Sequence, residues 1–384
     1  MKLFWIVQKD LLQDLDSATW IEPSRILTEQ GFQVLLIHAN QNGATIRNDS
    51  PALNARKIRV INRFPLMSIS FHFQVLFRIL YWVFSEKPVI VLTHPITALF
   101  LLPAILLSRL ARIKTKFVLD IRTLPVGSFG LSGKIKTQII YLSILAGKLF
   151  FDGITVITPA LKTKLVGRYN ISPDKIGIWS SGVNTTLFNS ESRRKQFENG
   201  EFTVLYHGVM AENRGIIETI CAMEIVAKEA EPITLILVGA GPSRDKIEHL
   251  IREKNLQDCV KLVPPVPQDE IPNYIQAADC GILPLPDYEF WRISSPLKLF
   301  EYLAMSRPVI VSRIEAHVSV LQDNSAGIYL PDVTPERIAE TILTAYSHRG
   351  QLHEWGEAGR RLVLDKFTWH HQTEKLSTYL KKLN

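Results

Sequence analysis

Cysteine is scarce in this sequence. Its three cysteines, Cys221, Cys259 and Cys280, lie far apart without metal-ligand spacing, and an odd number cannot all pair. We interpret them as reduced, buried thiols of a cytoplasmic protein. The sequence therefore favours neither a disulfide-built fold nor a cysteine metal centre, and we expect no metal and no cofactor.

Long apolar runs are also missing. The apolar stretch at the N-terminus is too short for an export signal and turns acidic at Asp10, so it predicts a first core strand. Phe71–Phe84 is interrupted by Arg78, and Ile96–Leu107 contains Pro103. Neither reaches the run of about 18 apolar residues expected of a spanning helix. No repeat of fixed period is visible.

Acidic residues are scarce in the first half. Residues 1–190 carry 22 Lys or Arg and 10 Asp or Glu, a net charge of +12, whereas the remainder has a net charge of −5. This asymmetry indicates an anionic partner, a membrane surface or nucleic acid. No nucleic-acid motif accompanies it, so we expect no nucleic acid as partner. The basic runs at 56–59, 109–116 and 134–136 instead flank very apolar segments, which favours peripheral attachment to an anionic membrane.

One apolar stripe has two interpretations. Helical spacing aligns six side chains: Phe73, Leu76, Phe77, Leu80, Tyr81 and Phe84. We favour packing of this stripe in the core, and contact with a membrane is the alternative.

The length of 384 residues suits two domains, and both halves alternate strands with helices. Such alternation predicts α/β domains with parallel sheets whose ligands lie at the carboxyl ends of the strands. We place the first domain at 1–190, the second at 191–365 and a final helix at 366–384. The strands expected are 2–7, 33–38, 57–61, 89–93, 117–121, 153–156, 203–207, 234–238, 260–262, 280–283 and 308–311. The helices expected are 18–30, 71–84, 97–111, 134–150, 214–230, 242–255, 268–277, 296–305, 335–347 and a helical tail from 351.

The stretch Arg292–Ser312 predicts a helix start followed by a buried strand. Ser294 or Ser295 is placed to cap a helix whose first residue is Pro296, because proline has no N–H to leave unpaired there. The N–H groups of a helix start bind phosphate well. Glu301, about one turn further in, reaches hydroxyls on a phosphate-bearing ligand. The alternative is an ordinary crossover with a surface glutamate.

Within this stretch, SPLKLFEYLAMSRPVIVS resembles the signature of glycosyltransferase family 4, the retaining nucleotide-sugar transferases of GT-B fold. Three more stretches agree in type and order: Ser180–Phe188, Val204–Ile220 and Leu235–Pro242. The resemblance is strong from Ile154 to about Leu330 and weak over the first 110 residues. It implies two Rossmann-like, doubly wound parallel-sheet domains facing each other across a cleft, with the last helix crossing back onto the first domain.

The resemblance also implies a donor site. In the family a basic residue matching Arg214 grips the donor diphosphate, a glycine turn lines the base pocket, and a glutamate matching Glu301 hydrogen-bonds the ribose. Each of these residues also has an alternative interpretation. Lys298 either pairs with phosphate or is solvated, and Arg214 is alternatively an ordinary surface charge. The glycines alternatively serve only to form tight turns. The donor-binding residues expected are Gly208, Arg214, Gly239, Gly241, Pro242, Ser295, Pro296, Lys298, Leu299 and Glu301.

Two positions depart from the family pattern. The family carries an earlier glutamate eight positions before the one matching Glu301, and this chain has Ile293 there. The family also has a second basic residue after the first glycine, and this chain has Val209. Donor sugar identity therefore does not follow from the resemblance.

The first domain contributes candidates on the acceptor side. Asp120 and Arg122 follow a strand end, where family members touch donor sugar or acceptor, and the alternative is a structural ion pair. His94 follows another strand, and a structural histidine is its alternative. The family's glycine-rich first loop is missing between Gln8 and Ser17, which leaves Ser17 as a candidate without a motif.

These residues predict a cytoplasmic, membrane-peripheral retaining glycosyltransferase that acts on a lipid-linked or polysaccharide acceptor in cell-surface glycan synthesis. Arg214, Lys298 and Asp120 are its expected catalytic residues. A GT-B sugar-nucleotide epimerase and a non-catalytic nucleotide-binding or partner subunit are the alternatives. An epimerase needs acid and base groups on both sides of the sugar, and a non-catalytic subunit would show no turnover with any donor.

Overall fold

The computed structural model describes residues 1–11, 17–40, 54–60, 66–124, 130–190, 202–229, 232–322 and 326–384. The chain forms two compact units: unit 1 is Met1–Ser181 with Trp369–Asn384, and unit 2 is Gly182–Thr368. The sequence placed the boundary at residue 190. Val183 and Phe188 are instead buried in the core of unit 2, which draws the chain from Gly182 onwards into that unit. Residues 191–201, which follow this boundary, lie outside the described residues.

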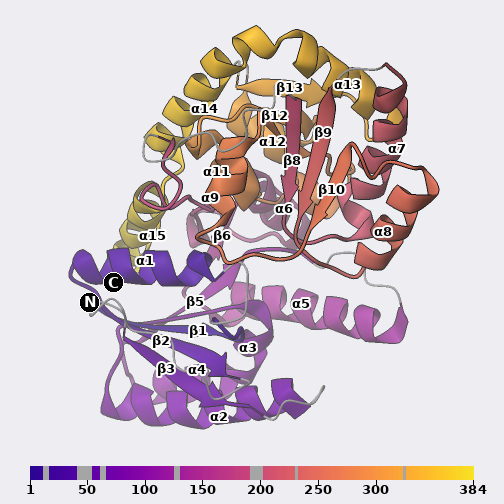
Figure 1. The fold of residues 1–384 in the computed structure, drawn as a ribbon. Helices are drawn as coiled ribbons and strands as arrows, with labels where there is room; N and C mark the ends of the chain where they lie inside the picture. The colour runs from indigo at the N-terminus through magenta and orange to yellow at the C-terminus, as the bar shows by residue number, and fades with distance from the viewer. Residues whose placement is uncertain are drawn as a thin grey trace. The chain divides into compact units, whose positions relative to one another are not determined.

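Unit 1 is built on a parallel sheet of seven strands in the order β3-β2-β1-β4-β5-β6-β7 (Figure 1). β4 and β6 are buried along their whole length and β1 along all of it except Lys2, which is why these strands appear in the sequence as continuous apolar runs. The strand order reverses beside β1. The strands are β1 Lys2–Val7, β2 Gln33–Asn40, β3 Ala55–Arg59, β4 Ile90–Thr93, β5 Lys116–Ile121, β6 Gly153–Val156 and β7 Ile176–Ile178.

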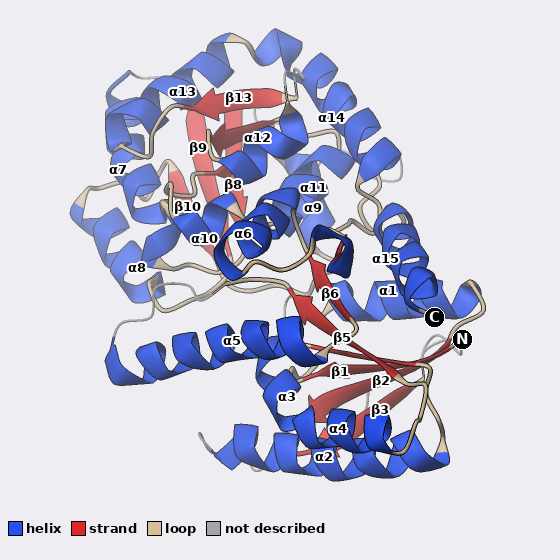
Figure 2. Cartoon of the chain, turned by 180° about the vertical axis from the view of Figure 1, so that it is seen from behind, coloured by secondary structure: helices blue, strands red, loops and turns tan. Residues whose placement is uncertain are grey.

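Helices cover both faces of this sheet (Figures 1 and 2). The crossovers from β3 onwards run in one direction along the sheet, so right-handed connections place their helices on one face, opposite α1. The long helix expected at 97–111 is two helices, because Pro103 opens a new helix after a break at Leu101. The helices are α1 Ala18–Glu29, α2 Leu66–Ser85, α3 Pro95–Phe100, α4 Leu102–Leu110, α5 Gly130–Phe150, α6 Pro159–Tyr169 and the 3₁₀ turn Pro173–Lys175.

The last helix, α15 (Trp369–Leu383), belongs to unit 1, as the two-domain fold implies. It packs against α1 and β7. Trp369, its first residue, is buried. The Tyr379 hydroxyl accepts a hydrogen bond from the Ile154 amide at 3.1 Å and donates one to the Lys175 carbonyl at 2.5 Å, so it joins β6 to the turn that precedes β7.

The apolar stripe of α2 was expected to pack in the core, and this prediction is wrong. Phe73, Phe77 and Tyr81 are 51%, 66% and 68% exposed. The helix packs on the sheet through another face, represented by Phe71 and Val75, which are fully buried. At 20 residues, α2 is also longer than expected, and by length and composition alone it would suffice to cross a membrane.

Unit 2 has a parallel sheet of six strands in the order β10-β9-β8-β11-β12-β13. The order reverses at β8, and ligands of such sheets bind beyond the carboxyl ends of the strands at this point. The strands are β8 Phe202–His207, β9 Ile233–Val238, β10 Val260–Val263, β11 Cys280–Leu283, β12 Val309–Ser312 and β13 Gly327–Leu330.

The helices of unit 2 follow the expected alternation, with two short ones and a strand that the sequence did not indicate: α10, α12 and β13. In unit 1, α6 and β7 were likewise not foreseen. The helices are α7 Ile216–Val226, α8 Arg244–Glu253, α9 Ile271–Ala277, α10 Glu289–Arg292, α11 Leu297–Ala304, α12 Glu315–Leu321, α13 Pro335–Ser347 and α14 Leu352–Lys366, with 3₁₀ turns at Glu212–Arg214, Ala227–Glu229 and Arg349–Gln351.

Candidate functional site

Two glycine loops meet at the carboxyl edge of the unit 2 sheet. Gly208 follows β8 with φ +114°, and Gly239 follows β9 with φ +142°, backbone that side chains rarely adopt. A Cβ on Gly239 would lie 2.1 Å from the Gly208 carbonyl oxygen, and one on Gly241 would lie 2.1 Å from the Met210 carbonyl oxygen. The Met210 amide also donates to the Ala240 carbonyl at 2.8 Å. Packing between the loops thus requires the glycines, and Pro242 is exposed beside them.

The start of α11 differs from the expected cap. Pro296 is the N-cap residue, with extended backbone, and no side chain caps the helix. The Ser294 hydroxyl donates instead to the Trp291 carbonyl at 2.8 Å. Leu299, expected near the donor, is fully buried in the unit 2 core, so its side chain is turned away from any ligand. The uncapped start leaves the first N–H groups of the helix without side-chain partners.

Lys298, in the first turn of α11, lies against the β8 loop. A Cβ on Gly208 would be 2.3 Å from Cε of Lys298, and the Nζ atom is 5.7 Å from the centre of the Tyr206 ring. Burial, with a further contribution from Arg214, lowers the pKa of Lys298 to about 8, against the opposing effect of Glu301. The amine is therefore still mostly charged at neutral pH.

Glu301 lies one turn further along α11 and faces the end of β8. Its side chain is 13% exposed, and Oε2 is 3.4 Å from Nε2 of His207. Burial raises the pKa of Glu301 to about 7, although the charge of Lys298 acts in the opposite direction. Burial and Lys298 hold the pKa of His207 well below its ordinary value, so this imidazole is neutral. Among the described residues, its Nε2 atom has no hydrogen-bond partner.

Sequence reasoning did not single out His207. It is the last residue of an apolar strand and directly precedes Gly208, and that position was the signal available. The neighbouring Tyr302 fixes the strand end, since its hydroxyl donates to the Leu205 carbonyl at 3.0 Å and accepts from the His207 amide at 3.2 Å. The ring of His207 also packs edge-on against Tyr302. The imidazole is thus held rigidly beside Glu301.

Arg214 is oriented by an aromatic partner. Its guanidinium carbon is 4.8 Å from the centre of the Trp291 ring, a cation–π contact. The Trp291 indole N–H donates to the Asn213 carbonyl at 2.9 Å, so α10 is tied to the turn that carries Arg214. The same arginine acts on the buried Tyr206 hydroxyl, whose pKa burial raises to about 12. Trp291 is a second residue that sequence reasoning missed.

The residues just before Ile293 form the short helix α10. Ile293, which replaces the earlier family glutamate, is buried. Arg292 binds Asp287 through two hydrogen bonds of 2.6 and 2.8 Å. Val209 offers its carbonyl to the Tyr206 hydroxyl at 2.7 Å. At the two departures from the family pattern the structure thus has a buried apolar side chain and a backbone acceptor for Tyr206.

The candidate residues of unit 1 form contacts with other residues of the same unit. Asp120 is 2% exposed, and its Oδ1 accepts from the Thr155 hydroxyl at 2.7 Å and from the Trp179 indole N–H at 3.1 Å. Burial raises its pKa, opposed first by Arg122. The Arg122 guanidinium lies 4.0 Å from the centre of the Trp179 ring and donates to the Trp179 carbonyl at 3.2 Å. These contacts supply a structural role for both residues.

His94 caps α3 by accepting a hydrogen bond from the Ile96 amide at 3.2 Å. Burial, helped by His72, lowers its pKa to about 3. Ser17 precedes α1, and its hydroxyl makes no cap hydrogen bond. The rest of that loop, residues 12–16, lies outside the described residues. Within the part of the chain that the structure describes, no group of three or more His, Cys, Asp or Glu is placed to hold a metal ion.

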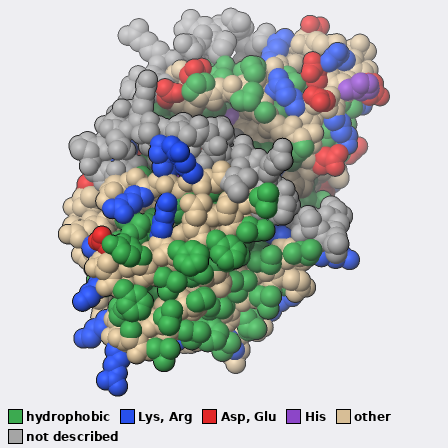
Figure 3. Space-filling model, turned by 90° about the horizontal axis from the view of Figure 1, so that it is seen from below, with side chains coloured by type: hydrophobic (Ala, Val, Ile, Leu, Met, Phe, Trp, Pro, Cys, Tyr) green, Lys and Arg blue, Asp and Glu red, His purple; other side chains and the backbone are tan. Residues whose placement is uncertain are grey.

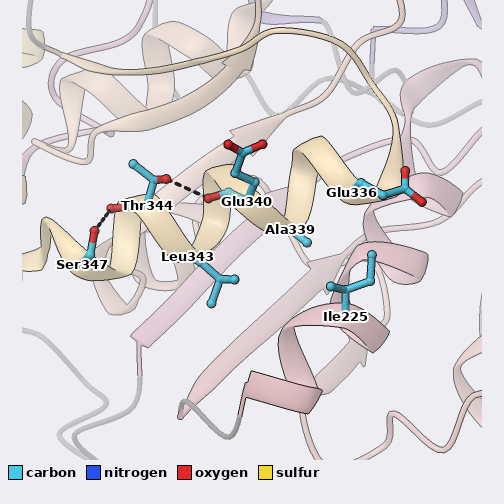
Figure 4. Close-up of a pocket in the computed structure, with 7 residues that line it drawn as sticks. All are labelled: Ile225, Glu336, Ala339, Glu340, Leu343, Thr344 and Ser347. Carbon is cyan, nitrogen blue, oxygen red and sulfur yellow. Dashed lines mark hydrogen bonds between the residues drawn. The ribbon is translucent and has the colours of Figure 1, made fainter.

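A separate hollow of about 460 Å³ lies between α7 and α13 (Figure 4). None of the donor-site candidates lines it. Glu336 and Glu340 give it acidic groups, which do not suit an anionic donor. It is lined by Ile225, Glu336, Ala339, Glu340, Leu343, Thr344 and Ser347.

Comparison with known proteins agrees with this arrangement. Residues 188–362 match the family model described as glycosyl transferases group 1, and residues 21–187 match that of glycosyltransferase family 4. The chain therefore belongs to the glycosyltransferase family 4 type and has the GT-B fold.

Individual relatives are distant. An amylovoran biosynthesis glycosyltransferase, AmsK, from Erwinia amylovora is 25% identical over 55% of this chain and 51% of its own length. A GDP-mannose-dependent phosphatidylinositol monomannoside mannosyltransferase from Mycobacterium tuberculosis is 23% identical over 52% of this chain and 54% of its own. The chain thus spans about half the length of these curated relatives.

Similar structures span the whole chain. A glycosyltransferase from Rickettsia africae has a TM-score of 0.75 at 17% identity, covering 100% of this chain and 98% of its own. Anabaena Alr3699/HepE in complex with UDP has a TM-score of 0.77 at 13% identity, with 100% coverage of both chains. At these identities the likeness shows the fold alone.

Proposed function

We propose that the protein transfers a sugar from a nucleoside-diphosphate sugar to a lipid-linked or polysaccharide acceptor, with retention of configuration at the transferred carbon. The observation that carries this proposal is the grouping in unit 2 of Arg214, Lys298 and the uncapped start of α11. Two cations and the positive end of a helix suit a diphosphate. Structures of HepE with UDP and UDP-glucose support a nucleotide-sugar donor, and retention rests on the family resemblance.

These groups act on the departing diphosphate. As the bond between sugar carbon and phosphate oxygen breaks, negative charge grows on the diphosphate and positive charge on the sugar. Fixed cations stabilise that growing charge more than they stabilise the bound donor, which lowers the barrier. Lys298 and Arg214 provide this stabilisation in the proposal, so the reaction needs no metal ion. The anionic donor also favours the protonated form of Lys298, whose pKa is about 8 in the free protein.

Glu301 holds the nucleoside part. A carboxylate with a pKa of about 7 ionises readily when hydroxyl donors approach it, because each donated hydrogen bond favours the charged form. In the proposal Glu301 accepts from the ribose hydroxyls, while the Gly239–Gly241 loop borders the base. The absence of side chains on Gly208 and Gly239 lets a ligand approach the backbone closely.

The acceptor class has separate support. The relatives named for amylovoran biosynthesis and for a phosphatidylinositol mannoside favour a glycan or lipid-linked acceptor. We place the acceptor on unit 1, where Ser17, His94, Asp120 and Arg122 are its candidates by resemblance. The positive surplus of residues 1–190 supports attachment to an anionic membrane. We therefore propose a cytoplasmic protein held at the inner face of the membrane.

A thermal-shift screen with UDP-, GDP-, ADP- and dTDP-sugars tests the donor site, followed by turnover of the stabilising donor with and without EDTA. One nucleotide class is expected to raise the unfolding temperature, because a ligand that binds only the folded state stabilises it. The shift should shrink in Glu301→Ala and persist in Glu248→Ala, whose residue is an exposed glutamate of α8. An absent shift, or an equal one in Glu301→Ala, would refute the site. Loss of turnover in EDTA would refute the metal-free chemistry.

A further inference from the structure

The helix layer α2, α4 and α5 of unit 1 presents apolar side chains outward (Figure 3). The helices share one face of the sheet, with α2 touching α4, and α3 linking α2 to α5. We name the exposed side chains the apolar layer face. On α2 they are Leu66, Ile69, Phe73, Phe77, Tyr81 and Phe84. On α4 they are Leu106, Leu107 and Leu110, and on α5 they are Ile135, Leu142, Leu145 and Leu149.

These helices are apolar on both sides. Phe71 and Ile79 of α2 and Ile144 of α5 are fully buried toward the sheet, so the inner faces already supply the core. A helix at the surface of a soluble domain ordinarily turns polar residues outward. Here Leu110 is 79% exposed and Phe77 66%. Contiguous exposed apolar surface of this kind marks a binding surface.

The charge around the face restricts what it binds. Between Leu66 and Phe150 the sequence has ten Lys or Arg and only two Asp or Glu. Of the two acids, Glu86 is bound to Lys2 at 2.8 Å, and Asp120 is buried. The helices themselves carry no acid, and their exposed cations include Arg78, Lys134 and Lys136. In Figure 3 blue side chains lie at the edge of the green area.

We infer that the apolar layer face inserts into the headgroup region of an anionic lipid bilayer, with α2, α4 and α5 lying along the membrane. This deepens, and rests on, the membrane attachment proposed above. Apolar and aromatic side chains bordered by cations are the composition of helices that lie in this interface. Since the inner face of α2 is packed on the sheet, α2 lies on the membrane and does not cross it, despite its sufficient length.

A second copy of the chain fits this face less well. Two copies related by a two-fold axis would bring the same cations together, and almost no acid on the layer would pair with them. A bilayer containing acidic phospholipid supplies both the apolar region and the counter-charge. The insertion also predicts something that charge alone does not: part of the binding must survive high salt, because salt screens charges and leaves apolar contacts intact.

The test is co-sedimentation of the full chain with vesicles of phosphatidylcholine, and of phosphatidylcholine mixed with phosphatidylglycerol, at low salt and at about 1 M salt. The wild type should bind the mixed vesicles more strongly and keep a salt-resistant fraction. Phe77→Glu/Tyr81→Glu should lower partitioning at least about tenfold, since it removes two apolar contacts. Both side chains are exposed, so the fold should survive. Leu364→Glu, at an exposed leucine of α14 in unit 2, is the matched control and should bind as wild type.

Three results would overturn the inference: wild-type partitioning by the double variant, complete release of the wild type by salt, or a dimer that forms without lipid and that the double variant abolishes. The donor thermal shift is measured on the same variants. If the double variant loses vesicle binding but is still stabilised by the donor, the role of the apolar layer face is supported independently of the proposed sugar transfer. If the wild type binds vesicles but no donor raises its unfolding temperature, membrane binding by the apolar layer face is supported and the proposed function is refuted.

Discussion

Replacing Glu301 by alanine should weaken binding of the nucleotide sugar by about 1–3 kcal/mol, the range for losing a charged hydrogen-bond partner. This corresponds to about 5- to 150-fold in Kd. The side chain is 13% exposed at the edge of the site, and the buried positions around it on α11, Phe300 and Tyr302, carry the packing. The variant should therefore fold.

The effect should depend on pH. The pKa of Glu301 is about 7, so the ionised acceptor is scarce at pH 6 and dominant at pH 8, and the gap between wild type and Glu301→Ala should widen over that interval. Glu301→Gln keeps an oxygen acceptor without the charge. It should lose less affinity than alanine and show a flatter profile.

The raised pKa of Glu301 also makes the stability of the fold depend on pH. The folded state binds the proton more tightly than the unfolded state, whose pKa is about 4.5. The stabilisation is therefore complete below about pH 4.5 and is lost as the pH rises through 7. Glu301→Gln removes this loss, so its unfolding temperature should fall less than that of the wild type between pH 5 and 8.

Calorimetric titration measures the affinities at about pH 6, 7 and 8, with the donor found by the screen. Thermal unfolding checks that each variant is folded. Glu248→Ala removes an exposed glutamate of the same unit and serves as the control. A folded Glu301→Ala protein with wild-type Kd at every pH would show that the carboxylate does not touch the donor.

Three further predictions concern other groups. Arg214→Ala should mainly lower kcat, because the charge it meets grows as the sugar leaves, and Arg214→Lys should recover part; wild-type kcat in a folded alanine variant would remove this arginine from the mechanism. Donor affinity should fall as pH rises past about 8, where Lys298 loses its proton, and a titration series should show that Lys298→Arg flattens this fall; an equally steep fall in that variant would contradict the assignment. Tyr379→Phe loses two hydrogen bonds and should lower the free energy of unfolding by about 1–3 kcal/mol in urea; an unchanged value would mean that the last helix is held by its apolar contacts alone.

The central strands could be predicted because they are short apolar runs buried on both faces. β1, β6 and β11 have the expected bounds. β13 escaped prediction because its apolar run, Ile328–Leu330, is too short to tell a strand from other structure. The four-residue α10 is too short for a helical period to be visible. Periodicity also located the stripe on α2 but not its side, since a helix apolar all round offers two stripes and only the sheet decides which one is buried.

The candidate site was predictable in its charged and glycine positions, which motif order indicated. Its aromatic and imidazole partners were not. Trp291 and His207 are remote in sequence from the residues they contact, Arg214 and Glu301, and only the fold brings each pair together. The predicted cap at Ser294 or Ser295 is wrong for a local reason: Pro296 adopts extended backbone and takes the N-cap position itself, so the helix starts one residue later.

Close packing of the two glycine loops couples the effects of substitutions at positions that are distant in sequence. A side chain on Gly239 would displace the Gly208 carbonyl, and one on Gly241 would displace Met210, on the same neighbouring loop. Once one of these changes has shifted that loop, the second has less left to disturb, so their effects should combine to less than their sum. We therefore expect a substitution in one loop to be tolerated better when the other loop also changes. In the proposed donor site, a change of donor preference is then expected to arise from side chains such as those of α10 more readily than from the glycines.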